Sequence, residues 1–123
     1  MTDVRADIRI DPRSTTPPFE QVRVQLLAQM QDGTLPAGTR LAPVRQLAAE
    51  LNVAPGTVAR AYKELEESGA VETRGRGGTV VAWSTDAAER RIEMLAAQLA
   101  SAAREERVSA PRALEIVTRA LGA

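Results

Sequence analysis

The chain has 123 residues, of which 44% are hydrophobic, and its 16 basic and 16 acidic side chains give a formal net charge of zero. This length accommodates one ordinary domain, or a small domain with an appendage. The sequence holds no cysteine and no histidine, which excludes disulfides and removes the commonest metal ligand and general base. We therefore expect no metal site, no cofactor and no enzymatic activity.

Hydrophobic residues are spread through the chain rather than gathered in one long run. No apolar run approaches the roughly 20 residues that span a membrane, and residues 1–11 lack the apolar core of a signal peptide. We therefore expect a cytoplasmic protein without a membrane partner. Because only Phe19, Tyr62 and Trp83 are aromatic, aliphatic side chains and alanine must form the core, which favours helices.

The first 41 residues predict a short strand, a helix and a compact connection. Residues 8–10 alternate apolar and polar side chains, as a strand does, and a turn-rich segment follows at 11–18. A helix is expected from Pro18 to about Gln31, ended by Gly33 in a left-handed conformation. Its inner stripe is Phe19, Val22, Leu26, Leu27 and Met30, and the connection at 33–41 anchors in the core through Leu35 and Leu41.

The next stretch, residues 41–63, predicts two short helices joined by a tight turn. The first helix carries an apolar stripe at helical spacing. Pro55 suits the first turn of the second helix because it has a fixed φ and no amide hydrogen. The inward residues are Val44, Leu47, Ala48 and Leu51 on the first helix and Val58, Ala61, Tyr62 and Leu65 on the second.

The opposite side of the second helix predicts a surface that reads a DNA major groove. Small residues allow close approach, a threonine hydroxyl bonds to phosphate or a base edge, and an arginine forks to guanine. This side consists of Gly56, Thr57, Arg60 and Lys63. Taken alone, the same residues also fit an ordinary helical hairpin with a solvated outer face.

The distribution of charge favours DNA more than the net charge does. Residues 40–63 hold four cations against Glu50 alone, and four glutamates follow between residues 64 and 72. The positive charge is therefore focused on the two-helix stretch.

Beyond Gly69 the hydrophobic period changes from 3.6 to 2. Two β-type runs, at 70–73 and 79–83, flank a glycine-rich segment at 74–78, which predicts a β-hairpin. The order helix, helix, turn, helix, hairpin is that of a winged helix. Arg74 and Arg76 at the tip suit a minor groove or phosphate. A hairpin turn without a ligand is the alternative, and a nucleotide cradle is disfavoured because a strand, not a helix, follows the glycines.

Two further helices are expected after residue 84, at 86–107 with Thr85 as a cap and at 110–121 with Ser109 as N-cap. Each carries one apolar face, and so small a helical pair rarely folds alone. We expect these faces to pack against the same pair of a second copy; packing back on the first domain is the alternative. The candidate dimerisation residues are Ile92, Leu95, Leu99, Ala102, Leu114, Val117 and Leu121.

Seven short motifs occur in order between residues 18 and 81: PFEQV (18–22), GTLPAGTRL (33–41), VRQLA (44–48), NV (52–53), TVARAY (57–62), LEESG (65–69) and GRGGTVV (75–81). In this order they resemble the DNA-binding domain of GntR-type bacterial transcription regulators, over about half of the chain. The tail is similar to that of the YtrA-like subgroup, in which a helical pair dimerises. Larger subgroups carry a separate ligand-binding domain, for which 123 residues leave no room.

The resemblance also implies roles for single residues. Arg45 matches a family arginine that contacts DNA, Thr57 matches the hydroxyl residue of the reading helix, and Gly75, Arg76 and Gly77 match the wing tip. Two departures stand out. The chain has Ala42-Pro43 where many members have Pro-Ser, and Ala54-Pro55 where many have Ser-Arg or a similar pair. A capping hydroxyl and a reading arginine are thus absent, and Arg60 is expected to carry more of the base contact.

We therefore predict a mainly α-helical protein with a small β-hairpin. A winged helix-turn-helix DNA-binding domain at 1–84, with its core at about 17–83, is followed by a helical dimerisation region at 85–123. The predicted function is transcription regulation, as a repressor, by a homodimer that binds an inverted-repeat operator in double-stranded DNA. The alternative is a winged-helix protein–protein module without sequence-specific DNA binding. The candidate DNA-binding residues are Arg45, Gln46, Ala54, Pro55, Gly56, Thr57, Arg60, Lys63, Arg74, Gly75, Arg76 and Gly77. The sequence specifies no effector, although the hinge at 84–88 is a candidate place for one.

Overall fold

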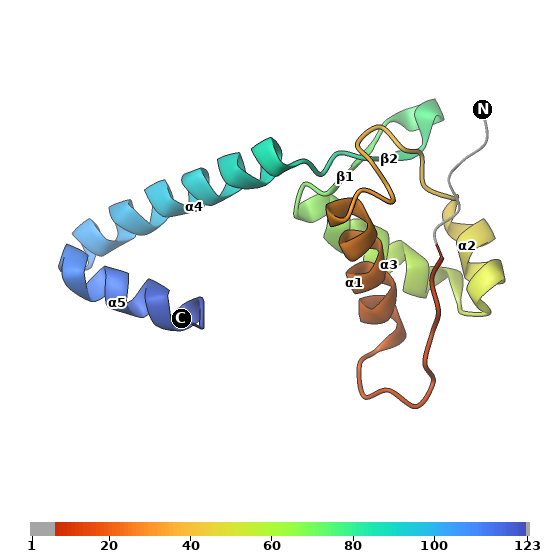
Figure 1. Cartoon of the computed structure of the whole chain (residues 1–123), viewed down its shortest axis with the longest axis horizontal. Coiled ribbons are helices and arrows are strands. Elements are labelled where there is room, and N and C mark those ends of the chain that lie inside the picture. Colours follow the sequence, from red (N-terminus) through yellow and green to blue (C-terminus); the bar gives the residue numbers. More distant parts are fainter. Residues whose placement is uncertain (1–6, 123) are drawn as a thin grey trace. The chain divides into compact units, whose positions relative to one another are not determined.

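The computed structural model describes residues 7–122 and divides into two compact units, Met1–Thr85 and Asp86–Ala123 (Figure 1). The predicted fold class is confirmed: the elements are mainly helical, with one small antiparallel hairpin in winged-helix order. They are α1 (Pro18–Gln31), α2 (Val44–Leu51), α3 (Pro55–Glu67), β1 (Val71–Thr73), the 3-10 turn η1 (Gly75–Gly77), β2 (Thr79–Val81), α4 (Thr85–Glu105) and α5 (Ala110–Ala120). Within the described residues, no helix is both long and apolar enough to cross a membrane.

The helix ends of the first unit follow from local chemistry. Pro18 and Pro55 open α1 and α3, as expected of residues without an amide hydrogen. Gly33 follows α1 with φ of 89°, which confirms the left-handed end. Asn52 ends α2 with φ of 57°, a conformation that asparagine tolerates better than most residues.

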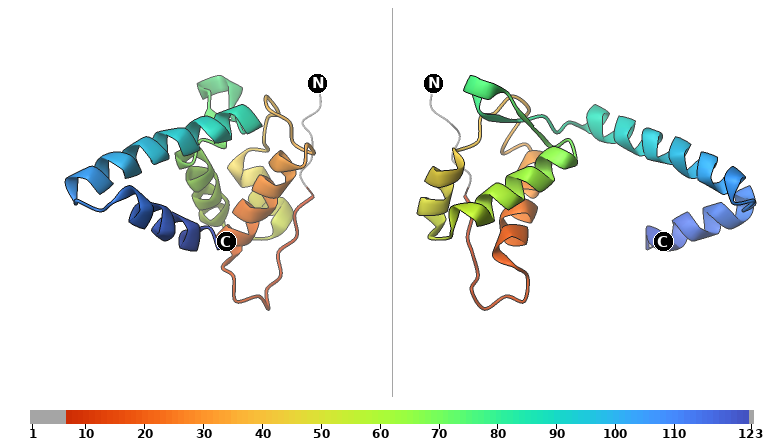
Figure 2. Two further views of the ribbon diagram at one scale, coloured as in Figure 1. Left: turned by 60° about the vertical axis from the view of Figure 1, so that its left-hand side comes forward. Right: turned by 180° about the vertical axis from the view of Figure 1, so that it is seen from behind.

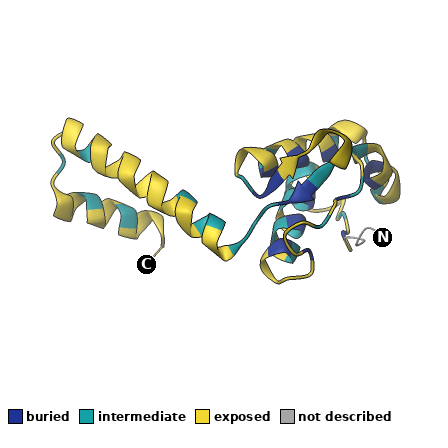
Figure 3. Cartoon of the chain, turned by 90° about the horizontal axis from the view of Figure 1, so that it is seen from above, coloured by how far each residue is buried: buried dark blue, intermediate teal, exposed yellow. Residues whose placement is uncertain are grey.

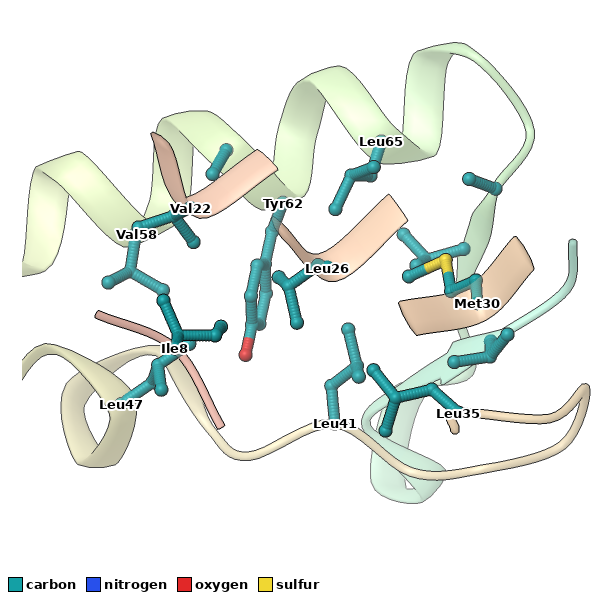
Figure 4. Packing of buried hydrophobic residues seen from close by; sticks show 14 of the residues in the cluster. Ile8, Val22, Leu26, Met30, Leu35, Leu41, Leu47, Val58, Tyr62 and Leu65 are labelled. Atoms are coloured by element: carbon teal, nitrogen blue, oxygen red, sulfur yellow. The ribbon is translucent and has the colours of Figure 1, made fainter. Parts of the chain in front are cut away.

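The core of the first unit lies around α3, which packs on α1 and on α2 (Figure 2). Figure 4 shows Leu26 and Tyr62 at the centre of this cluster. The anchors Leu35 and Leu41 are confirmed, since both are buried. Phe19 and Leu27, expected on the inner stripe of α1, are only half-buried. The largest fully buried side chains are Val22, Leu26, Leu35, Val58, Leu65, Val71 and Val81.

The predicted strand at Ile8-Arg9-Ile10 is wrong. These residues run along α1 without a strand partner among the described residues, and Ile8 is buried in the core. Side-chain amides of α1 replace a neighbouring strand. The amide of Gln25 accepts a bond of 3.0 Å from the Arg9 amide and donates one of 2.7 Å to the Arg9 carbonyl.

Two more glutamines of α1 extend this arrangement one helical turn in each direction. Gln21 makes the same pair of bonds with the backbone of Asp11, at 2.8 and 3.0 Å, and Gln29 donates to the Asp7 carbonyl at 3.0 Å. Four helical residues rise about 6 Å, and two extended residues rise about 6.6 Å. Because the two rises nearly match, every second residue of the segment 7–11 lies beside every fourth residue of α1, where a glutamine side chain can bond to its backbone.

The connection before α2 adds a third strand-like segment to the hairpin. The Leu41 amide donates to the Thr79 carbonyl and the Val81 amide donates to the Thr39 carbonyl, both at 2.8 Å. Arg40 thereby pairs with Val80 in an isolated antiparallel bridge. The hairpin strands are shorter than the predicted runs at 70–73 and 79–83. They pair antiparallel, with Val71 opposite Val81 and Thr73 opposite Thr79.

The second unit consists of α4 and α5 alone. Neither helix has a buried residue, and Figure 3 shows how much of their surface is exposed. The N-cap of α5 is confirmed, because the Ser109 hydroxyl accepts a bond from the Arg112 amide. The predicted cap of α4 is wrong: Thr85 is its first helical residue. The helix also ends at Glu105, earlier than expected, because Arg107 adopts φ of 57°.

Substitution of Leu26 by alanine tests the position of the core. Leu26 has no exposed surface, so Leu26→Ala should lower the free energy of unfolding by about 2–5 kcal/mol. Val24 on the same helix is 48% exposed, and Val24→Ala should change it by no more than about 0.5 kcal/mol. Urea denaturation at one fixed protein concentration measures both, and equal losses would contradict this core.

Candidate nucleic-acid and subunit interfaces

The buried side of α3 decides which of its residues face solvent. Val58, Ala61, Tyr62 and Leu65 are buried, which confirms the predicted inner side. The structure therefore brings the predicted reading residues together on the outer side of one helix. Ala54, Pro55, Gly56, Arg60 and Lys63 are exposed, whereas Thr57 is half-buried.

The first turn of α3 combines an open backbone with uncapped amides. Apart from its chain neighbours and the backbone of its own helix, no described heavy atom lies within 4 Å of the place where a Cβ of Gly56 would stand. The N-cap residue, Ala54, has no side chain that accepts a bond from the first amides, and Pro43 leaves α2 uncapped in the same way. At α3 only the Gly56 amide is left for an anion, because Pro55 has no N–H and the Thr57 amide donates to the Ala54 carbonyl at 3.0 Å.

Arg60 is held on two sides. Its Cζ lies 3.6 Å from the centroid of the Phe19 ring, and its Nε donates to Glu64 Oε2 at 3.3 Å. The contact with Glu64 could be predicted from the sequence, because Arg60 and Glu64 are spaced i, i+4 on one helix. The contact with Phe19 could not be predicted in this way, because it joins residues of two helices that lie 41 positions apart in the sequence.

The polar residues of α2 differ in how they are engaged. Arg45 is exposed and makes no hydrogen bond or ion pair within the part of the chain that the structure describes. The Gln46 amide donates to Glu50 Oε1 at 3.2 Å. Arg45 is therefore available to a ligand, while Gln46 is tied to its own helix.

The two arginines of the wing differ in the same way. Arg74 binds Glu72 through Nη2 at 3.1 Å and Nε at 3.3 Å, whereas Arg76 is exposed and has no bonding partner among residues 7–122. The tip is the tight 3-10 turn η1, which includes Arg76 and is closed by a bond of 2.8 Å from the Gly77 amide to the Arg74 carbonyl. Gly75 has φ of 52°, which suits glycine.

Arg40 lies at the base of the wing and was not among the predicted site residues. A Cβ at Gly78 would stand 3.1 Å from Arg40 Nε, so the arginine crosses directly against the glycine backbone. The sequence places Arg40 in the basic stretch, but only the pairing of Arg40 with Val80 brings it to the hairpin.

Tyr62 connects α3 to the residues that precede α2. Its hydroxyl donates to the Ala42 carbonyl at 2.6 Å. Burial raises the pKa of this hydroxyl well above its ordinary value, and the negative charge of Glu50 adds to the effect. The bond fixes the distance between the two helices of the predicted DNA-reading motif.

An apolar groove of about 360 Å³ opens between α4 and α5 within the second unit. Of the predicted dimerisation residues, Leu99, Leu114 and Val117 line this groove. The other four are exposed outside it: Ile92, Leu95, Ala102 and Leu121. The remaining lining residues are Ala96, Ala100, Ala103, Arg104, Val108, Ala110 and Ala113.

Comparison with known proteins places these features in one family. The family described as bacterial regulatory proteins, gntR family, matches residues 18–81, the segment from the start of α1 to the end of β2. The chain is 44% identical over 103 residues to the HTH-type transcriptional regulator Rv1152 of Mycobacterium tuberculosis, covering 84% of this chain and 78% of that protein.

Two proteins named YtrA are also similar. The HTH-type transcriptional repressor YtrA of Bacillus subtilis is 48% identical over 71 residues, which span 57% of this chain and 55% of the repressor. The solved structure of YtrA from Sulfolobus acidocaldarius, a GntR-family transcription factor, superposes with a TM-score of 0.60 at 31% identity, covering 74% of this chain and 96% of that chain. The similarity therefore extends beyond the winged-helix segment.

Removal of the Tyr62 hydroxyl should change how stability depends on pH. At neutral pH, Tyr62→Phe should cost about 0.5–1.5 kcal/mol, because it leaves the Ala42 carbonyl without its donor. An unfolded tyrosine ionises near pH 10, about where the free phenol does, while the folded one stays protonated. The wild type should therefore lose stability as the pH rises above about 10, and the variant should lose less.

Denaturation between neutral and alkaline pH measures this difference. Since Tyr62 is the single tyrosine of the chain, tyrosinate absorbance reports on it alone. Ionisation of the folded protein at the pH of free tyrosine would contradict the buried hydroxyl.

Proposed function

Because this chain belongs to the GntR family of bacterial regulatory proteins, we propose that it acts as a homodimer that binds an inverted-repeat operator. Membership makes the chain a transcription regulator with a winged helix-turn-helix DNA-binding domain, and not an enzyme. Such a regulator works in the cytoplasm, where bacterial DNA lies. The observation that carries the proposal is the outer side of α3, where small residues surround a stacked arginine.

The residues at the start of α3 enter the major groove in this proposal. Ala54, Pro55 and Gly56 let the backbone approach the bases, and Thr57 bonds to phosphate or to a base edge. Arg60 forks to a guanine and Lys63 binds the backbone further along the groove. The amides at the N-terminus of α2 and the Gly56 amide of α3 add phosphate contacts beside Arg45.

The wing supplies a second contact. Arg76 at the tip enters the minor groove or binds phosphate, supported by the close turn of Gly75 and Gly77. Arg74 serves the wing itself, because Glu72 already neutralises it. Arg40, at the base of the hairpin, is an additional phosphate contact.

The second unit is proposed to form the dimer. Both of its helices expose large apolar side chains, from 42% for Leu99 to 78% for Leu121, without a covering element of their own unit. A contiguous apolar face of this kind marks an interaction surface. A two-fold pair of chains then requires an operator with matching symmetry.

Repression is the proposed mode of action, supported by the repressor name of the Bacillus subtilis relative. A dimer bound over a promoter blocks transcription without further chemistry. The protein–protein alternative leaves the free cations of the domain without a role, since Arg45, Lys63 and Arg76 bind no described residue. The hinge at 84–88 offers no set of side chains that specifies an effector.

The salt dependence of binding to a duplex of arbitrary sequence tests the wing contact. Each phosphate contact contributes about 0.9 to the slope of log K against log salt concentration. Arg76→Gln should make the negative slope shallower by about 0.9, and Arg74→Gln should change it less because Glu72 already binds Arg74. Arg119→Gln, an equal change of charge in α5, is the control. Equal slopes in all three variants would argue against the wing.

Sedimentation velocity tests the dimer. Leu99→Glu places a charge on the groove wall and should convert dimers into monomers, because an unpaired charge is costly to bury. Ser101→Glu adds the same charge to α4, two residues further along and outside the groove lining, and should leave the dimer intact. A wild type that stays monomeric at every accessible concentration would refute this assignment.

A further inference from the structure

Arg60 presents three distinct sides to its surroundings. The face of its guanidinium lies on the Phe19 ring, and its Nε–H is directed at Glu64. The two terminal Nη groups bond to nothing within the described part of the chain, and 63% of the side chain is exposed. The free Nη groups provide the two in-plane donors that fork to the O6 and N7 of guanine.

Stacking on an aromatic ring restricts an arginine without consuming its donors. A cation is attracted to the ring face, while the N–H groups lie in the guanidinium plane and point away from the ring. An exposed arginine otherwise samples many rotamers, and it loses that freedom when it binds a base. The ring therefore removes part of this entropic cost before DNA arrives.

The surroundings of Phe19 keep the ring in place and give each carboxylate near Arg60 a second cation. Phe19 is the second residue of α1, half-buried where α1 packs on α3. On the next residues of α1, Glu20 is bound by Arg23, with 3.0 Å between Arg23 Nη2 and Glu20 Oε2. Arg23 also feels the charge of Glu64. Both nearby carboxylates are thus shared with a second cation.

We propose that Phe19 is a positioning residue for DNA reading, whose ring holds the Arg60 guanidinium ready to fork to one guanine of each half-site. This inference rests on the proposed function, since it requires an operator and a base-reading Arg60. It goes further by assigning part of the specificity to a residue of α1, outside the helix that enters the groove. The opposite model, storage of Arg60 away from DNA, predicts that loss of the ring strengthens binding.

A double-mutant cycle tests the assignment with full-length protein. The probes are the operator enriched from a random duplex pool and duplexes in which each of its base pairs is changed in turn. Phe19→Leu removes the ring and keeps an apolar side chain, and Phe19→Tyr keeps the ring. Phe19→Leu should weaken binding to the operator about two- to fivefold, the worth of an exposed cation–π contact. Phe19→Tyr should bind like the wild type.

The pattern of losses matters more than their size. Phe19→Leu should reduce discrimination at the same base pair as Arg60→Ala, and it should add nothing in the Arg60→Ala background. An equal loss on every duplex, a loss that persists without Arg60, or tighter binding by Phe19→Leu would each overturn the assignment. Thermal unfolding of each variant is the control for the fold: a variant that unfolds at the same temperature as the wild type has lost binding and not structure.

The wild type and Arg60→Ala distinguish failure of the proposed function from failure of this inference. If the wild type enriches no operator, or Arg60→Ala loses affinity equally on all sequences, base reading by Arg60 is wrong and Phe19 has nothing to position. If Arg60→Ala loses discrimination at one base pair and Phe19→Leu does not, only the role of Phe19 is wrong. As a check without DNA, the Arg60 Nε–H resonance should lose a ring-current shift in Phe19→Leu.

Discussion

The packing of α3 against α1 and α2 is the constraint on which the rest of the first unit depends. It buries Val58, Tyr62 and Leu65 on one side, and that burial alone determines that Gly56, Arg60 and Lys63 face outward. The Tyr62 hydroxyl ties the same helix to the backbone before α2. The contact with α1 also brings Phe19 beneath Arg60, so the packing that stabilises the domain orients the arginine that we propose reads DNA.

The two units solve the problem of burial differently. The winged helix-turn-helix domain has a closed core of its own, reinforced by the hairpin and by the glutamine-bound segment along α1. In the second unit, no side chain of α4 or α5 is buried. The exposed apolar side chains of this unit support the proposal that it dimerises.

Most local features could be predicted from the sequence, except the cap and the end of α4, whereas most contacts between distant segments could not. The helices, their proline starts, the Gly33 end and the Ser109 cap follow from residues a few positions apart. The third strand-like segment depends on the pairing of Arg40 with Val80, which lie 40 positions apart. Residues 8–10 alternate like a strand, but their backbone is bonded by glutamine side chains of α1 and not by another strand. The Phe19–Arg60 stack likewise needs two helices to pack before it exists.

Selection from a random duplex pool shows whether this chain reads DNA sequence as a two-fold dimer, as we propose. The purified full-length chain would be used at near-physiological salt, where non-specific binding is weak. A two-fold sequence reader should enrich one inverted repeat, with half-site centres about one helical turn apart. Weak, salt-sensitive binding to all sequences without enrichment would contradict this proposal, and would mean that Ala54-Pro55 has removed base reading from α3.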